Sequence, residues 1–304
     1  MFTTALRNAV RLRPSSSFAM LVLVISAAHA PAQPVPAFAV RRVVHEHQRT
    51  MILIPGLFSS GDVWNGLAAH LGRGFDLHVL TLAGFAGVPP LRADGFFDAE
   101  RDAIARYIKD KHLDHPILVG HSLGGALALA VGAMVPDLVG AIVVVDAVPF
   151  LPALNDSKAT AAANRATADA IRHAYAAATP AQMAAQSGAA FRGVMRDTLH
   201  LAEAIGWSAA SDPATAGRAV ADMMVTDLRP LMPAIRSPVL LVAAGGAAVT
   251  PAAVETIRAT YEAQVAGIPI HRVVVAENAR HFIMYDAPTF LFETMDAFFK
   301  EHSR

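Results

Sequence analysis

Gly120-His121-Ser122-Leu123-Gly124 is the stretch from which this sequence is best understood. The apolar run at 116–119 leads into these five residues, and an alanine- and leucine-rich stretch follows them. This order predicts a strand, a sharp turn and a helix, and the two glycines allow strand and helix to pass close together. The turn lifts the Ser122 hydroxyl into the open, which makes this serine a candidate nucleophile.

A serine hydroxyl is a weak nucleophile, so the turn carries chemistry only if a base and an orienting acid reach it. His281 is the candidate base, because it stands in the loop that follows the last predicted strand. His121 lies inside the turn itself, and we interpret it as a packing or hydrogen-bonding residue.

Short apolar runs alternate with helical stretches through most of the chain, which predicts an α/β fold with parallel strands joined by crossover helices. The runs are continuously apolar, so the sheet is expected to be buried on both faces. The predicted strands are 50–54, 77–82, 116–120, 141–145, 238–243 and 271–276, with an antiparallel edge strand within 38–47. The predicted helices are 62–71, 98–111, 123–135, 251–264 and 287–300, the last with Asp286 as N-cap and Pro288 in its first turn.

The alternation stops between residues 150 and 237, where strand signals vanish and alanine-rich helical stretches take over. We interpret this segment as an inserted helical cap of about four helices. Thr179-Pro180 and Asp212-Pro213 each pair an N-capping residue with a proline at the first helical position. Six large apolar side chains of the cap are candidates for a substrate cavity, although most are expected to serve packing: Met183, Phe191, Met195, Trp207, Met223 and Met224.

Composition narrows the class of function. The chain has 304 residues, of which 54% are hydrophobic and 16% charged, enough for one large catalytic core with an insertion. Lys plus Arg and Asp plus Glu both number 25, so the charge balance gives no reason to expect nucleic acid as a partner. The sequence has no cysteine, which excludes disulfides, thiol nucleophiles and thiolate metal sites.

The N-terminus has the features of a targeting segment. Arg7, Arg11 and Arg13 precede an apolar run at 18–28, and small residues follow it. We expect a secretory signal peptide over 1–32, cleaved after Ala32, and a secreted or periplasmic mature chain that has no stable membrane span. A mitochondrial transit peptide and an uncleaved anchor are the alternatives.

With these motifs the sequence resembles the α/β-hydrolases of the esterase and lipase type. The resemblance covers most of residues 50–299. It rests on the Pro55-Gly56-Leu57-Phe58 turn, the strand-to-helix turn at 120–125 that carries Ser122, and the Arg280-His281-Phe282 loop. It implies an α/β-hydrolase fold with a mostly parallel central sheet, flanking helices and a cap. The expected divisions are a signal peptide (1–32), core (33–149), cap (150–237) and core (238–304).

The triad acid departs from the usual pattern of the family. In most relatives it follows the strand predicted at 238–243, but the loop after that strand has no carboxylate, and Ala247 occupies the usual position. Asp146 ends the strand at 141–145, where some relatives place their acid. We therefore predict Asp146 as the residue that orients His281.

The resemblance implies a serine esterase that works through an acyl-enzyme, with a small-molecule ester as substrate and no metal or cofactor. We expect carboxylic esters of small to medium size and apolar character as the substrates. Leu123, directly after the nucleophile, and Leu57, by resemblance, are expected to supply oxyanion N–H groups. The entrance, or mouth, of the substrate pocket is expected to be apolar and to be formed by Phe58, Trp64 and Phe150. Carbon-carbon hydrolases, acyltransferases and perhydrolases use the same triad. A ligand-binding protein on a hydrolase scaffold is the alternative of another class.

Overall fold

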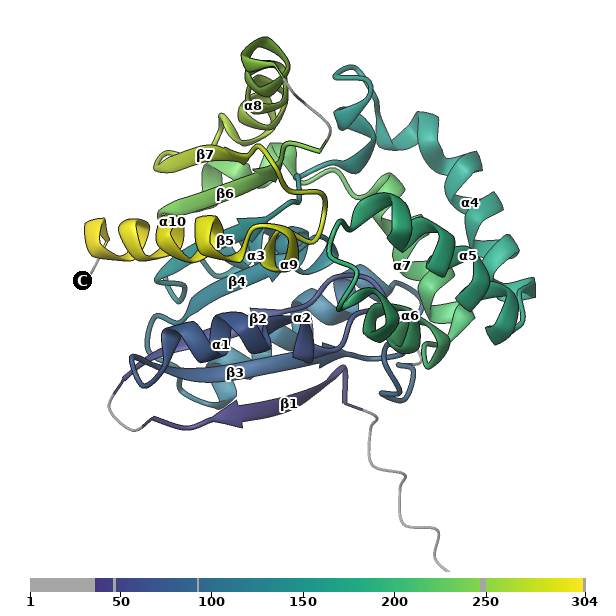
Figure 1. The fold of residues 1–304 in the computed structure, drawn as a ribbon, viewed down its shortest axis with the longest axis horizontal. Helices are drawn as coiled ribbons and strands as arrows, with labels where there is room; N and C mark the ends of the chain where they lie inside the picture. The colour runs from purple at the N-terminus through teal and green to yellow at the C-terminus, as the bar shows by residue number, and fades with distance from the viewer. Residues whose placement is uncertain (1–35, 46–47, 92, 247–249, 303–304) are drawn as a thin grey trace, which may run out of the picture. The chain divides into compact units, whose positions relative to one another are not determined.

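Figure 1 shows a computed structural model, which describes residues 36–45, 48–91, 93–246 and 250–302. The chain divides by its internal contacts into Met1–Pro34 and Val35–Arg304, and the described residues all belong to the second unit. The predicted signal peptide at 1–32 lies outside them, as does Ala247.

A single sheet in the described chain has the strand order β1-β3-β2-β4-β5-β6-β7. β1 runs antiparallel to β3, and every other pairing is parallel, as predicted. The strands are β1 (Phe38–Val43), β2 (Arg49–Ile54), β3 (Phe75–Leu82), β4 (Ile117–His121), β5 (Ala141–Val145), β6 (Val239–Ala244) and β7 (His271–Ala276). All residues of β4 and β5 are buried, which agrees with their continuous apolar sequence.

Helices cover both faces of the sheet (Figure 1). The short 3-10 turn η1 (Gly61–Trp64) leads into α1 (Asn65–Leu71), which packs beside α10 (Pro288–Glu301) on one face. The other face carries α2 (Phe96–Asp110) packed against α3 (Leu123–Met134). α8 (Pro251–Val265) follows β6, and the short α9 (Ile283–Asp286) precedes α10. None of the helices in the described ranges is long and apolar enough to cross a membrane.

Four α-helices stand between β5 and β6, the number expected for the cap segment. They are α4 (Ala161–Ala177), α5 (Pro180–Val194), α6 (Leu201–Ala209) and α7 (Pro213–Val225), flanked by the 3-10 turns η2 (Leu151–Leu154) and η3 (Arg229–Ala234). Thr179 and Asp212 cap α5 and α7 as predicted, because each side-chain oxygen accepts the N–H three residues ahead. α4 packs on α7, and α5 packs on α6.

The predicted N-cap of the last helix is wrong. Asp286 ends α9, and Ala287 takes the N-cap position of α10 without a side-chain bond. The Asp286 carboxylate points instead to a neighbouring segment, where it accepts the N–H groups of Arg196 and Asp197 at 2.8 and 2.9 Å. Pro288 does occupy the first turn, as predicted.

Candidate active site

Ser122 stands between β4 and α3 in a strained backbone conformation, with φ of 52° and ψ of −121°. The close approach of strand and helix explains the two glycines beside it. A Cβ at Gly120 would overlap the Gly124 carbonyl, and a Cβ at Gly124 would overlap the Ile54 carbonyl. A non-glycine residue in this region of φ and ψ costs on the order of 1–3 kcal/mol, and such strain clusters at functional sites.

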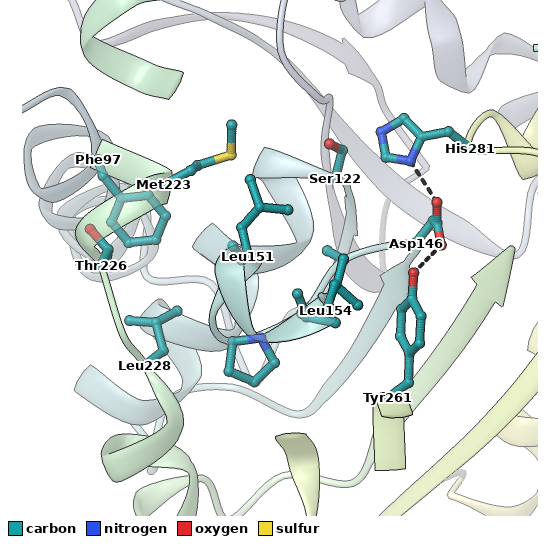
Figure 2. Close-up of a pocket in the computed structure, with 14 residues that line it drawn as sticks. Phe97, Ser122, Asp146, Leu151, Leu154, Met223, Thr226, Leu228, Tyr261 and His281 are labelled. Atoms are coloured by element: carbon teal, nitrogen blue, oxygen red, sulfur yellow. Dashed lines mark hydrogen bonds and ion pairs between the residues drawn. The ribbon is translucent and has the colours of Figure 1, made fainter. Parts of the chain in front are cut away.

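Asp146 and His281 are brought together from positions 135 residues apart. The His281 Nδ1–H donates to Asp146 Oδ2 at 2.6 Å (Figure 2). Asp146 follows β5 directly and has a positive φ of 47°. Its other oxygen, Oδ1, accepts the Ala244 N–H and the Tyr261 hydroxyl, each at 2.8 Å.

These hydrogen bonds decide the charge of Asp146. Burial by itself would raise the pKa of this carboxyl, but the bond and the charge of His281 outweigh it. The Ala244 N–H and the Tyr261 hydroxyl act in the same direction, so the pKa of Asp146 lies below its ordinary value. Asp146 is therefore an anion that accepts from Nδ1, and the remaining ring nitrogen of His281 is free to act as a base.

His121 supports His281 from inside the core. Its Nε2–H donates to the His281 carbonyl oxygen at 3.0 Å, and the two ring centroids lie 4.6 Å apart. Burial, followed by the charge of His281, lowers the pKa of His121 to about 3. His121 is thus neutral at physiological pH, and it has the hydrogen-bonding role that the sequence suggested.

Two cavities open beside Ser122. The β5-side cavity has a volume of about 190 Å³ and is lined by Phe97, Ser122, Ala126, Asp146, Ala147, Val148, Pro149, Leu151, Leu154, Met223, Thr226, Leu228, Tyr261 and His281 (Figure 2). The β2-side cavity has a volume of about 330 Å³ and is lined by Leu57, Phe58, His121, Ser122, Tyr175, Gln186, Ser187, Ala190, Phe191, Val194, Val220, Met223, His281 and Phe282. Of the six cap side chains considered for a cavity, Phe191 and Met223 line these two.

Of the three residues predicted for the mouth of the site, Phe58 is the one that lines a cavity beside Ser122. Phe58 lines the β2-side cavity. Trp64 and Phe150 line neither cavity, and both are fully buried. Trp64 ends the η1 turn inside the core, whereas the Phe150 ring lies under the Arg229 guanidinium, with 4.8 Å between its centroid and Cζ.

The expected oxyanion donors flank the nucleophile. Leu123 is the first residue of α3, where a backbone N–H has no carbonyl within its own helix. Leu57 follows β2 and lines the β2-side cavity together with Ser122. The next residue, Phe58, has a positive φ of 63°, and its ring packs against Tyr175 of α4 and Phe191 of α5. The turn that carries Leu57 is therefore in contact with two helices of the cap.

Tyr261 is the site residue that the sequence did not reveal. It lies within α8, where nothing in the sequence separates a tyrosine that bonds a carboxylate from one that only packs. The second missed feature is the contact of Asp286 with the loop that carries His281. Asp286 accepts the Arg280 N–H at 2.8 Å, and the Arg280 guanidinium donates to the Arg192 carbonyl at 3.1 Å.

Comparison with known proteins agrees with this fold. A model of the alpha/beta hydrolase family matches residues 51–294. The chain belongs to the alpha/beta hydrolase family. A bromoperoxidase from Bacillus anthracis has a similar structure, with a TM-score of 0.71 at 18% identity over 86% of this chain and 95% of that one.

Curated relatives match over shorter stretches. A pimeloyl-[acyl-carrier protein] methyl ester esterase from Citrobacter koseri is 30% identical over 103 residues, which are 34% of this chain and 38% of the relative. Lipase LipV from Mycobacterium tuberculosis is 33% identical over 96 residues, or 32% of this chain and 36% of the relative. The matches thus span little more than a third of these relatives. Hydrolase activity fits the family, and the relatives carry esterase and lipase names.

Proposed function

We propose that the protein is a serine carboxylesterase with Ser122 as nucleophile, His281 as base and Asp146 as orienting acid. The observation that carries the proposal is the 2.6 Å bond between His281 Nδ1 and Asp146 Oδ2 in a cavity that Ser122 also lines. The esterase and lipase names of the relatives support the same chemistry. The position of Asp146 after β5, instead of after β6, suits the absence of a carboxylate from the loop that follows β6.

The reaction begins when Ser122 Oγ attacks the ester carbonyl carbon and His281 Nε2 takes the hydroxyl proton. The carbonyl oxygen becomes an anion, which accepts hydrogen bonds from the N–H groups of Leu57 and Leu123. His281 then gives the proton to the departing alkoxide, and the acyl group stays on Ser122. Water, deprotonated by His281, attacks the acyl-enzyme and releases the carboxylic acid, which regenerates the serine.

Asp146 stabilises the imidazolium form of His281 in both halves of this reaction. Replacement of Asp146 by Ala is expected to lower kcat on the order of 10,000-fold, because the orientation and the compensating charge are both lost. Steady-state hydrolysis of a short p-nitrophenyl ester measures the effect. A loss of less than about tenfold would show that Asp146 is not the triad acid.

Ser122→Ala separates the esterase from a ligand-binding protein on the same scaffold. An esterase loses turnover and keeps its fold, which circular dichroism and thermal unfolding report. A binding protein has no turnover to lose and keeps its ligand affinity. Turnover of the p-nitrophenyl ester at the wild-type rate by Ser122→Ala would contradict the proposed nucleophile.

A further inference from the structure

The two cavities lie on opposite sides of the nucleophile. β4, which carries Ser122 at its end, stands between β2 and β5 in the sheet. Leu57 follows β2 and lines one cavity, whereas Ala147 follows β5 and lines the other. The order of the strands therefore separates the two spaces along the same edge of the sheet, with Ser122 between them.

Three residues line both cavities: Ser122, His281 and Met223. The first two belong to the proposed chemistry, so Met223 is the shared residue without a chemical role. It lies near the end of α7 and is half-buried (Figure 2). Its flexible thioether chain is thus placed where the two spaces meet over the nucleophile.

Both linings are apolar and carry little charge. Among the described residues that line them, Asp146 is the one carboxylate, and it is paired with His281; neither lining has a lysine or arginine. A charged group moved from water into such a space would lose its hydration without gaining a partner, so its binding there is disfavoured. The cavities thus suit neutral, apolar groups.

The chemistry of ester cleavage needs two such spaces. In the tetrahedral intermediate the carbonyl carbon is bonded to Ser122 Oγ, to the oxyanion, to the acyl chain and to the alkoxy group. Once the oxyanion points to Leu57 and Leu123, the acyl chain and the alkoxy group leave the carbon in two different directions. Two cavities that share Ser122 match these two directions.

We infer that the natural substrate is an ester with two neutral apolar arms, one in each cavity, and that Met223 separates the arms. This inference rests on the proposed esterase function. An apolar cavity of about 150 Å³ holds one benzene molecule, so the β5-side cavity has room for about one such ring and the β2-side cavity for about two. The shorter arm occupies the β5 side and the longer arm the β2 side.

Two filling variants test the assignment. Leu154→Phe reduces the β5-side cavity, and Ala190→Phe reduces the β2-side cavity. Their matched controls are the exposed neighbours Asn155→Phe and Ala189→Phe, which line neither space. The substrates are a series of methyl esters with acyl chains from acetyl to decanoyl, and a series of acetates with alcohols from methyl to decyl.

Each filling variant is expected to lower kcat/KM by at least about tenfold for the long members of one series and to leave the other series within about twofold. The two variants affect different series, and the controls affect neither. The inference is overturned if both variants affect the same series, or if neither changes the dependence on chain length. Absence of ester turnover in the wild type would instead contradict the proposed function.

Met223→Ala and a charged substrate complete the test. The alanine variant joins the two spaces, so its kcat/KM is expected to stay high for longer arms on the β5 side than the wild type accepts. A methyl ester with a terminal carboxylate is expected to have kcat/KM about 100-fold below that of its uncharged analogue. Equal rates for the two esters, or an unchanged chain-length limit in Met223→Ala, would contradict the inference. Labelling of Ser122 by a small fluorophosphonate checks that each variant keeps an intact site.

Discussion

Asp146 is held by more hydrogen bonds than orientation of His281 requires. One oxygen faces the His281 ring, and the other accepts from the Ala244 N–H and the Tyr261 hydroxyl. Tyr261 also lines the β5-side cavity, so its ring stands beside the carboxylate at the edge of the substrate space. We therefore expect Tyr261 to be a positioning residue that acts on catalysis through Asp146.

Tyr261→Phe removes the hydroxyl and keeps the ring. Without this donor the Asp146 carboxylate is less stabilised, so the pKa of Asp146 rises. Catalysis needs the ionised carboxylate of Asp146, so the acid limb of the kcat/KM profile is expected to move to higher pH, with a three- to tenfold loss at neutral pH on the order of one hydrogen bond. A purely structural role for Tyr261 would lower the rate evenly at all pH values.

The sequence predicts those candidate residues that belong to a short local motif. Ser122 and His281 stand in motifs, and Asp146 is the carboxylate at the end of a buried strand. Tyr261, Trp64 and Phe150 show the limit, because their roles depend on which way a side chain points after folding. The sequence does not distinguish an aromatic residue that lines a cavity, such as Phe58, from one that is buried in the core, such as Trp64.

The segment between α5 and α6 is hydrogen-bonded to the loop that carries His281 and to the helix that follows it. Asp286 accepts N–H groups from both segments, and Arg196 donates from its guanidinium to the Asn278 carbonyl at 2.9 Å. The His200 and Tyr285 rings stack with centroids 4.0 Å apart. The cap segment is thus joined to the segment that carries His281 and Tyr285 by polar and aromatic contacts.

Asp286→Ala is expected to loosen both segments, because the N–H groups of Arg196, Asp197 and Arg280 lose their shared acceptor. Hydrogen exchange at these three amides should accelerate by at least about tenfold, and kcat should fall by about tenfold as His281 becomes less well oriented. Asp286→Asn keeps one acceptor oxygen and should give intermediate values. Unchanged exchange at the Arg280 amide in Asp286→Ala would contradict this role.

Helices and strands follow from sequence where local signals agree. The Thr179-Pro180 and Asp212-Pro213 pairs mark true helix starts, since capping and proline geometry act within a few residues. Asp286-Ala287-Pro288 offers a similar pattern and fails, because the acidic side chain finds three backbone N–H groups elsewhere. A tertiary contact of this kind outweighs a local cap and has no trace in the sequence.

The buried side chain of Glu100 is expected to make the stability of the folded protein depend on pH. It is fully buried on α2, where one oxygen accepts the Ala83 N–H at 3.3 Å and the other has no partner within the described chain. Burial raises the pKa of Glu100 from 4.5 to about 9. The folded protein therefore keeps this carboxyl protonated where the unfolded chain loses the proton.

The direction of the pH dependence follows from the higher pKa of Glu100 in the folded protein than in the unfolded chain. The stability that neutral Glu100 contributes is fully present below about pH 4.5 and is lost progressively as the pH rises toward 9. Glu100→Gln remains neutral, so it is expected to raise Tm by a few degrees at pH 8 and by much less at pH 5. Thermal unfolding at both pH values checks this, with the exposed Glu293→Gln as control. A gain that is equal at both pH values would contradict the assignment.

The order of strands and helices was predictable as a whole, because a parallel sheet with crossover helices writes an alternating pattern along the chain. The strand order within the sheet, the two cavities and the contacts of the cap depend on how distant elements meet. Contacts between elements that are distant in the sequence leave no local pattern from which they could be predicted. The resemblance to the α/β-hydrolases supplied the fold, and the geometry supplied the partners of Asp146.

Covalent labelling tests the central claim most directly. The full chain is treated with a fluorophosphonate, and the modified peptide is mapped by mass spectrometry beside Ser122→Ala and Asp146→Ala. We predict rapid modification at Ser122, no modification of Ser122→Ala, and a rate about 1,000-fold lower in Asp146→Ala. A folded wild-type protein that is not labelled at Ser122, or an Asp146→Ala variant labelled at the wild-type rate, would contradict the triad.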